Sequence, residues 1–535
     1  MDTAIMVLLI LTILYVPIWF WVWRNPEKGE KYHLVKYGPL LMIKTHLGIK
    51  TMDRLGQHRL VWRIFGFISR LLSAILFFLM MYMLVMSILS IPSRIGNGGM
   101  GIQFALAIPG FNPMLPLTYG IFALFVAMVV HEMGHGIQSR ANNCKVDSTG
   151  LLYGVVPWGA FCEPNEEQLQ KLSRGPQMDI YSAGISVNTF VAAISIALML
   201  LLCSAVIPAD YGQGEGEEDL PGIYYIDAES PGYLSGIPTS ALITGIKESG
   251  GSEYSSVWAV SSPKTVGMKS SITISPLHTY NLRYVLSDGS VNYSEPIQMG
   301  ALIKTVSNNS PASAAKLEPL TYLYSFTIGG VETPISDSYD FIDYMSKTSP
   351  GELITVTTAT ISDGGEIKTT VHEEVSLTSS GSQGYLGVSV TNSGFTFTTP
   401  AMMKQTATDP FYGCTDPFSY VQGLFKYLSG PINGLDPIPD KVTWWYDTPF
   451  GDLTWVMIKT LYWLFWLDLL LAISNALPAY PFDGGFLFEG GINWLLEKLG
   501  IKDGERRSKL SRSISSSIST VTLMMFFLVL LVLII

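Results

Sequence analysis

Long, uninterrupted stretches of apolar residues dominate the hydrophobic pattern of this chain. A run of roughly 20 apolar residues is long enough to cross the hydrocarbon core of a membrane as a helix. Stretches of this kind occur at about residues 3–23, 71–92, 114–136, 182–207, 453–476 and 513–535. The pattern therefore predicts a polytopic α-helical membrane protein with six transmembrane helices.

The segment between the fourth and fifth predicted spans has a different pattern, with short alternating runs rich in Ser, Thr, Val and Gly. Such runs, bounded by turn residues, are typical of β-strands. Within this segment, ESPGYLSGI (229–237) and NSPASAAKL (309–317) each place Ser-Pro and small residues where a short helix would begin. The second motif is followed by a strand, a helix and a strand, in an order that resembles a PDZ domain. We therefore expect a β-rich insert with PDZ-like modules at 220–300 and 301–395.

The PDZ resemblance implies a possible peptide ligand for the insert, because PDZ domains bind an extended peptide by adding it to a sheet edge. The alternative is a β-rich cap that binds no ligand. In either case, residues 400–452 are expected to connect the insert to the fifth predicted span.

The membrane part is predicted to consist of an N-terminal region, 1–113, and a core in two parts, 114–208 and 453–535. The N-terminal region contains a Gly-rich segment, 93–113, that is either re-entrant or an ordinary loop. Residues 146–165 alternate in polarity around Gly and Pro, which predicts a hairpin of two short strands. If this hairpin dips into the membrane, other parts of the protein must bury its backbone.

The distribution of charge orients the chain. Only 14% of its residues are charged, compared with roughly 25% in soluble domains. Residues 24–70 hold ten Lys and Arg and three acids, and 497–512 is also basic, whereas 209–400 hold eight Lys and Arg and twenty-one acids. The positive-inside rule places both basic loops in the cytoplasm, so both termini and the PDZ-like insert are expected to be extracytoplasmic. No basic patch suggests nucleic acid as a partner, and the four cysteines show no zinc-finger or disulfide pattern.

The third predicted span ends in residues that do not suit lipid. Seventeen uncharged residues from Met114 lead into VVHEMGHGIQ (129–138). An ionisable group at membrane depth costs about 3 kcal/mol or more, so it is a functional candidate by default. His131 and His135 lie one helical turn apart and can bind a single metal ion, as in the HExxH motif. Glu132 projects about 100° away from His131 around the helix, which suits a general base beside the ion.

A catalytic zinc ion usually has three protein ligands, so the chain must supply one more. In ISNALPAYPFDGGFLFEGG (473–491), Pro478 and Pro481 break the helix that ends the fifth span. Asp483 follows, and the two glycines after it allow a tight backbone. At 1.5 Å per residue, Asp483 falls in the same layer near the cytoplasmic face as His131, Asn188 and Asn475.

Three other carboxylates compete with Asp483 for the role of third ligand. Asp468 lies two helical turns before Asn475 and is expected near mid-membrane, where it either pairs with a polar neighbour or stays protonated. Glu163 and Asp179 flank the hairpin and the fourth span, and both are expected to be solvated surface carboxylates. Asp483 alone combines the right layer with a broken helix, so we expect it to be the ligand.

These motifs together resemble the site-2 protease family of intramembrane zinc metalloproteases. The resemblance rests on HEMGH (131–135), AGISVN (183–188) and NALPAYPFDGG (475–485), and on the hairpin sequence VVPWGAFCEP (155–164). It covers about 114–208 and 453–495. The chain departs from the family at Ile185, where Pro is frequent, and at Phe482, where Leu is frequent.

The family resemblance assigns a role to each candidate site residue. It implies that His131, His135 and Asp483 bind one zinc ion per chain and that Glu132 is the catalytic base. Asn188 and Asn475 would help to hold the substrate or the oxyanion. The implied function is hydrolysis of peptide bonds in or near the transmembrane segment of a membrane-protein substrate, close to the cytoplasmic side.

Two functions of other classes are alternatives. The first is a non-catalytic membrane scaffold with peptide-binding PDZ modules and a structural metal site. An intact Glu132 argues against it, because a structural site needs ligands but no base. The second is an ion transporter, which is disfavoured because no repeated half with matching broken helices is apparent in the sequence.

Overall fold

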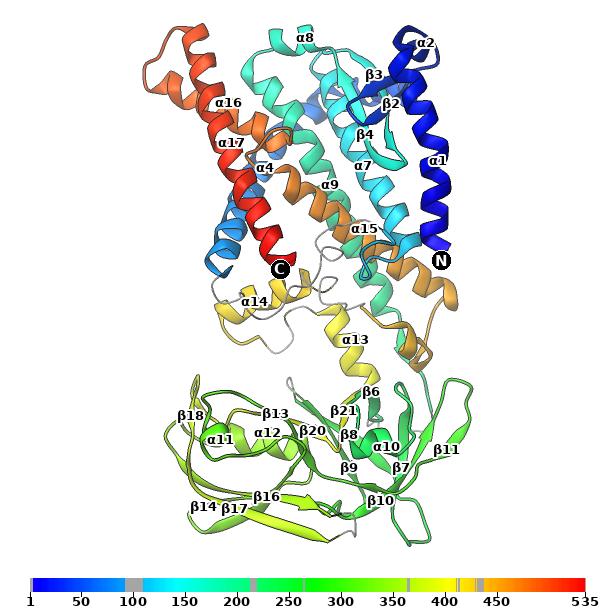
Figure 1. The fold of residues 1–535 in the computed structure, drawn as a ribbon, viewed down its shortest axis with the longest axis vertical. Coiled ribbons are helices and arrows are strands. Elements are labelled where there is room, and N and C mark those ends of the chain that lie inside the picture. The colour runs from blue at the N-terminus through cyan, green and yellow to red at the C-terminus, as the bar shows by residue number, and fades with distance from the viewer. Residues whose placement is uncertain are drawn as a thin grey trace. The chain divides into compact units, whose positions relative to one another are not determined.

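The computed structural model describes residues 3–91, 109–211, 219–262, 265–362, 366–409, 411, 414–428, 430 and 437–534. The chain divides into two compact units, both drawn in Figure 1. The membrane unit comprises Met1–Leu201, Pro431–Gly434 and Val456–Ile535. The β unit comprises Leu202–Gly430 and Leu435–Trp455.

Five of the described helices are long and apolar enough to cross a membrane, judged by length and composition. They are α4 (Arg59–Leu89), α7 (Leu117–Ala141), α9 (Arg174–Ser204), α15 (Asp452–Asn475) and α17 (Gly504–Ile534). Each corresponds to one predicted span. These helices agree with the predicted helical membrane protein.

The count of six spans remains a prediction. The first predicted span, 3–23, forms the helix α1 (Thr3–Arg24), but α1 is not among the five candidates. The Gly-rich segment predicted at 93–113 lies outside the described residues as far as residue 108. Short helices complete the membrane unit: α2 (Pro26–Lys31), α3 (Ile49–Gly56), α8 (Glu166–Lys171) and α16 (Asp483–Lys498).

The ends of α7 and α15 follow from their local sequences. Pro116 precedes the first turn of α7, where a missing backbone N–H costs nothing. Asn143, two residues past the end of α7, has φ 61°, a left-handed conformation that Asn adopts more readily than most residues. Helix α15 ends at Asn475, and a new helix, α16, begins at Asp483. The predicted break after the fifth span is confirmed, but the sequence analysis did not predict α16.

A four-stranded antiparallel sheet lies beside α7. Its strands are β1 (Leu34–Tyr37), β2 (Leu40–Thr45), β3 (Val146–Gly154) and β4 (Val156–Pro164), in the order β1-β2-β3-β4. Strands β3 and β4 are the predicted hairpin, which is confirmed. Strands β1 and β2 come from the basic loop before α4 and were not predicted. Since β4 is an edge strand, one of its sides is free of strand pairing in the described residues (Figure 1).

Small residues let the helices of the membrane unit approach each other closely. Leu76 of α4 and Ile185 of α9 share a buried cluster with Ala472 of α15. A Cβ added at Gly134 of α7 would lie 2.9 Å from the side chain of Val187 of α9, closer than real contacts allow. Close packing through small side chains is what holds helices together in lipid.

The β unit is built around one 12-stranded antiparallel sheet, whose main path runs β11-β10-β7-β6-β21-β20-β13-β14-β16-β17. Its strands are β6 (Gly222–Ile226), β7 (Leu242–Glu248), β10 (Thr279–Val285), β11 (Val291–Tyr293), β12 (Ile297–Gln298), β13 (Ala301–Val306), β14 (Tyr322–Ile328), β15 (Val331–Pro334), β16 (Leu353–Ile361), β17 (Ile367–Ser376), β20 (Val388–Asn392) and β21 (Phe395–Thr398).

Shorter elements surround this sheet. Three strand pairs lie outside it: β5 (Ile207–Pro208) with β22 (Tyr446–Asp447), β8 (Val257–Ser262) with β9 (Thr265–Ser270), and β18 (Thr378–Ser380) with β19 (Gln383–Tyr385). The helices are α10 (Pro231–Leu234), α11 (Pro311–Ala314), α12 (Ser338–Ser346), α13 (Pro400–Thr408), α14 (Pro417–Leu428) and the 3-10 helix η2 (Asp440–Trp445).

Two hydrophobic cores divide this sheet into two modules. The first module consists of β6, β7, β10 to β12 and β21 of this sheet together with the pair β8–β9, and its core includes Tyr280, Leu282 and Phe395. The second module consists of β13 to β17 and β20 with α11 and α12, and its core includes Phe326 and Val356. Because β21 follows the second module along the chain, the second module is inserted within the first.

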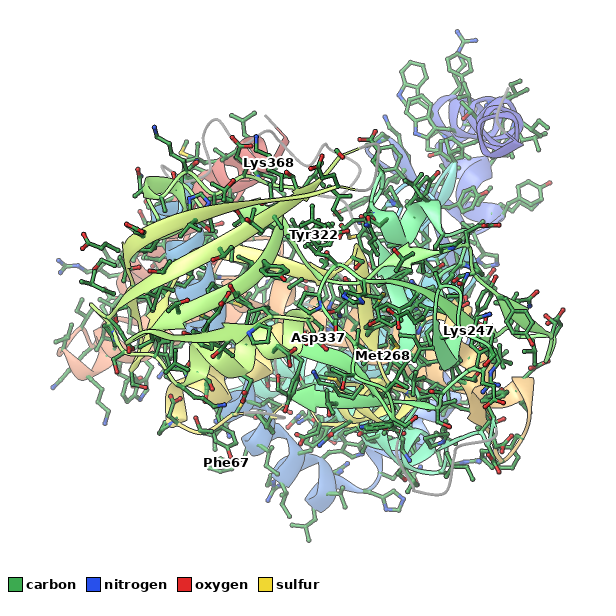
Figure 2. All side chains as sticks on the ribbon, turned by 90° about the horizontal axis from the view of Figure 1, so that it is seen from below. Phe67, Lys247, Met268, Tyr322, Asp337 and Lys368 are labelled. Atoms are coloured by element: carbon green, nitrogen blue, oxygen red, sulfur yellow. The ribbon has the colours of Figure 1, made fainter. Side chains whose placement is uncertain are left out.

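Polar contacts join the two modules. Lys269 of β9 in the first module places its Nζ 2.7 Å from Oδ1 of Asp340 of α12 in the second. Asn392 of β20 donates a hydrogen bond to a backbone carbonyl of β9. A Cβ added at Gly267 of β9 would lie 2.7 Å from Oδ2 of Asp337, which precedes α12 and is labelled in Figure 2. The two modules are therefore held together by side chains as well as by a shared sheet.

Candidate metal centre

Three potential ligands from two helices converge inside the membrane unit. The Nε2 atoms of His131 and His135, both on α7, are 3.2 Å apart. Oδ2 of Asp483, at the first position of α16, lies 3.1 Å from the first and 3.2 Å from the second of these nitrogens. His135 and Asp483 are about 350 residues apart in the chain. The structure therefore brings together the two histidines and the carboxylate that the sequence analysis selected.

The hydrogen bonding of His135 suits a metal ligand. Its Nδ1 lies 2.7 Å from the carbonyl oxygen of Ile180, so Nδ1 carries the proton and donates it. This leaves Nε2 with a free lone pair directed at His131 and Asp483. Three electron-pair donors that meet in a buried place repel each other unless a metal ion or a shared proton lies between them. Two nitrogen ligands and a carboxylate match a catalytic zinc site, so these residues fit zinc.

Gly184 of α9 makes room for the histidine pair. A Cβ added at this residue would lie 2.4 Å from Nε2 of His135 and 2.7 Å from Nε2 of His131. Any other residue would therefore occupy the space in which the ligand atoms meet. Gly184 belongs to the AGISVN motif, but the sequence analysis did not single it out.

The first turn of α16 is held close to the end of α15 by the two glycines after Asp483. A Cβ at Gly484 would lie 2.3 Å from the carbonyl oxygen of Leu477, and a Cβ at Gly485 would lie 2.8 Å from the carbonyl carbon of Ala479. Both glycines are buried. This contact fixes the direction in which α16 leaves the break, and hence the position of the Asp483 carboxylate.

Glu132 is held by the edge strand of the small sheet. Its Oε2 accepts a hydrogen bond from the backbone N–H of Cys162 of β4, at 2.8 Å. Burial raises the pKa of the Cys162 thiol, and Cys162 does not belong to the cluster of possible metal ligands in the described residues. Cys162 is thus a residue near the site that sequence reasoning missed. The signal available for it was its place in the predicted hairpin.

The two candidate asparagines are not joined to the ligand cluster by any contact recorded among the described residues. Asn188 lies one turn after Gly184 on α9 and is fully buried, and neither polar atom of its side chain has a hydrogen-bond partner in the described part of the chain. Asn475 is partly exposed and donates to the carbonyl of Leu471 in its own helix. The roles of both asparagines remain predictions.

The three rival carboxylates lie elsewhere. Asp468 is fully buried in α15, and within the described residues neither of its oxygens has a hydrogen-bond partner. This disfavours the first of the two expected alternatives, pairing with a polar neighbour, and leaves the second open. Glu163 is partly exposed. Hydrogen bonds from Lys44, which has the larger effect, and from Ser148 hold the pKa of its carboxyl below the ordinary value. Asp179 is buried and pairs with Arg70 at 2.8 Å. The expectation of a solvated Asp179 was therefore wrong, because α4 brings a cation beside it.

Comparison with known proteins identifies a family for this chain. The model of peptidase family M50 matches residues 119–526, which is more than half of the chain and includes the three candidate ligands and Glu132. The uncharacterized protein MJ0971 of Methanocaldococcus jannaschii is 30% identical over 204 residues, which make up 37% of this chain and 52% of that protein. The match thus spans about half the length of this relative.

Proposed function

Because this chain belongs to peptidase family M50, the site-2 protease family of membrane zinc metallopeptidases, we propose that it cleaves other membrane proteins in or near a transmembrane segment. Such cleavage is the final step of regulated intramembrane proteolysis. The observation that carries the proposal is the meeting of His131, His135 and Asp483, with Glu132 on the same helix as the histidines. The family match supports a membrane metalloprotease, and the kind of substrate is our inference.

The proposed roles follow from the position of each side chain. His131, His135 and Asp483 hold one zinc ion, which supplies a Lewis acid and lowers the pKa of water when it is bound. Glu132 is not among the three converging groups, so its carboxylate is free to accept a proton and pass it to the leaving amine. The buried, unpartnered amide of Asn188 supports a role in holding the substrate.

Strand β4 is well placed to hold an unwound substrate. Its outer edge faces α7, and the N–H of Cys162 on that edge already contacts Glu132. Backbone N–H groups alternate along a strand, so the N–H of Ala160 points the same way as that of Cys162. An extended substrate strand could pair with this edge beside the metal site.

The charge pattern supports the proposed orientation. The two basic loops are taken to be cytoplasmic, and both termini and the β unit extracytoplasmic. The active site then lies near the cytoplasmic side. On the outer side, the two modules of the β unit, if PDZ-like, either exclude untrimmed substrates or bind a newly formed peptide end.

Metal analysis together with a cleavage assay tests the function. The purified chain should contain one zinc ion and cleave a single-span membrane reporter. Glu132→Gln should keep the zinc and lose cleavage, because Glu132 is the base and not a ligand. A wild-type chain that binds zinc and cleaves no membrane reporter would favour the non-catalytic scaffold instead. Cleavage by Glu132→Gln at the wild-type rate would remove Glu132 from the mechanism.

A further inference from the structure

A partly open cavity of about 290 Å³ lies where α9, α16 and α17 meet in the membrane unit. This volume is close to the lower end of the range for ligand pockets, roughly 300–1,000 Å³. The cavity is lined by side chains of α9 and α16, together with Ser508 of α17. None of the three candidate zinc ligands lines it, so the cavity lies beside the metal centre and not within it.

The α9 wall of the cavity continues the face that touches the metal centre. Gly184 lies against the two histidines. Tyr181, Gln177 and Arg174, which line the cavity, lie three, seven and ten residues before it. These spacings keep the residues on one side of a helix with 3.6 residues per turn.

The α16 wall repeats this arrangement from Asp483. Phe486, Glu489 and Asn493 line the cavity and lie three, six and ten residues after the proposed ligand. At 1.5 Å per residue the cavity extends from about 5 Å to about 15 Å beyond the metal centre along both helices. The stacked rings of Tyr181 and Phe486, 5.1 Å apart, mark its inner end. The cavity is therefore an extension of the metal centre toward the basic loop 497–512.

Glu489 is a carboxylate of this cavity that forms no ion pair in the described residues. The other charged group of the wall, Arg174, is already engaged by Glu497 at 2.7 Å and by Asn493 at 2.9 Å. Glu489 accepts a hydrogen bond from the hydroxyl of Tyr480, but no Lys or Arg forms an ion pair with it in the described residues. A half-buried carboxylate without a cation is ready to bind one.

We propose that this cavity binds the part of the substrate on the cytoplasmic side of the scissile bond, with Glu489 pairing with a Lys or Arg of that segment. Glu489 lies about 9 Å along α16 from Asp483, and an extended chain covers about 3.3 Å per residue. The basic residue would therefore stand about three positions from the scissile bond. Membrane proteins carry an excess of Lys and Arg at the cytoplasmic ends of their spans, so such segments are common. The inference rests on the proposed function.

A binding measurement tests the inference without cleavage. The full-length Glu132→Gln chain, in detergent, is mixed with a single-span reporter that carries Lys, Gln or Glu at one of the first five positions on the cytoplasmic side. We expect the Lys reporter to bind about tenfold more tightly than the Glu reporter when the varied residue stands at one of these positions, near the third. One partly buried hydrogen bond between charged groups has an effect of about this size. Adding Glu489→Gln should bring this ratio close to one, and Glu489→Lys should invert it.

A matched control is a variant without the carboxylate of Glu505, which lies in the basic segment 497–512 and does not line the cavity. Glu505 is exposed and, in the part of the chain that the structure describes, forms its ion pair with Lys509 of the same helix, so Glu505→Gln should leave the Lys-to-Glu ratio as it is. The same reporters are then cleaved by chains with an intact Glu132. The preference for Lys should appear mainly in KM. The ion pair between Glu489 and the Lys forms when the reporter binds and is equally present in the transition state.

The outcomes separate this inference from the proposed function. If the chain cleaves reporters but Glu489→Gln and Glu489→Lys leave the ratio unchanged, the cavity assignment is overturned and the protease function stands. If no reporter is cleaved but the Lys reporter binds more tightly through Glu489, the protease function is overturned, and the cavity remains a site for a basic segment of a membrane protein.

Discussion

At the scale of single residues, Asp483 and its rival Asp468 can be distinguished by metal content. We expect Asp483→Ala to lose most of its zinc and all cleavage, because its Oδ2 lies within 3.2 Å of both histidine nitrogens. Asp468→Asn should keep its zinc, because the buried Asp468 carboxylate makes no hydrogen bond in the described residues and belongs to no metal cluster there. Zinc stoichiometry of both purified variants decides between them. A full complement of zinc in Asp483→Ala would contradict the assignment.

Gly184 offers a second test at this scale. Gly184→Ala would place a methyl group 2.4 Å from Nε2 of His135, so the ligands must move apart. We expect zinc affinity to fall by about 10- to 100-fold, the range found when the support of a metal ligand is lost. Gly491→Ala in α16 is the control, because nothing lies within 4 Å of a Cβ there. Competition with a chelator measures both, and equal affinities would show that the close approach does not matter.

At the scale of secondary-structure elements, the contact between β4 and α7 can be tested at Cys162. Cys162→Pro removes the N–H that Glu132 accepts, and Pro is tolerated on an edge strand where the N–H faces outward. We expect a loss of kcat of about tenfold or more with zinc retained, because the base loses the bond that orients it. Cys162→Ala keeps the N–H and should retain most of the wild-type kcat. Similar kcat values for the two variants would mean that the strand does not orient Glu132.

Local signals made the larger elements predictable from the sequence. A helix in lipid satisfies its own backbone, so uninterrupted apolar runs alone indicated α4, α7, α9, α15 and α17. The alternation of residues 146–165 likewise indicated the hairpin β3–β4, because both strands are adjacent in sequence. His131 and His135 could be paired from their spacing on one helix. The break that presents Asp483 followed from two prolines.

Features that depend on contacts distant in sequence could not be predicted in the same way. Strands β1 and β2 extend the hairpin from a loop about 100 residues earlier, as in the pairing of Thr45 with Thr149. Asp179 was expected at the surface because its partner, Arg70, belongs to another helix. The need for glycine at position 184 arises only when α9 lies against the histidines of α7.

At the scale of the whole molecule, the β unit can be shortened between positions that are distant in sequence but close in space. The backbone N–H of Ser393 donates to the carbonyl of Gly300 at 2.9 Å, so both ends of the second module lie side by side. The hydroxyl of Thr399 donates to Oδ2 of Asp219 at 3.0 Å, which brings the ends of both modules together. Each cut can therefore be closed by a short Gly-Ser linker.

We expect removal of 220–398 to leave zinc binding and cleavage of a short, pre-trimmed substrate largely intact. Cleavage of full-length substrates should increase, because the modules are proposed to select substrates and hold no ligand of the metal. Rates for both substrates measure this selection. Removal of 301–392 alone is the control. It shows whether loss of the second module by itself gives the same increase in cleavage of full-length substrates. A stable, zinc-loaded deletion that cleaves neither substrate would make the β unit part of the catalytic fold.

The separation of His135 from Asp483 along the chain also affects biosynthesis. A ribosome that adds roughly 5–20 residues per second needs roughly 20–70 s to cover the 350 or so residues between them. Throughout that time α7 and β4 have been made, but α16 has not, so the third ligand does not yet exist. The unfinished chain therefore cannot hold a metal ion through all three candidate ligands, and the proposed cleavage of membrane proteins cannot begin at the insertion site. The order of synthesis therefore delays the proposed activity until α16 has been made and has reached the histidines of α7.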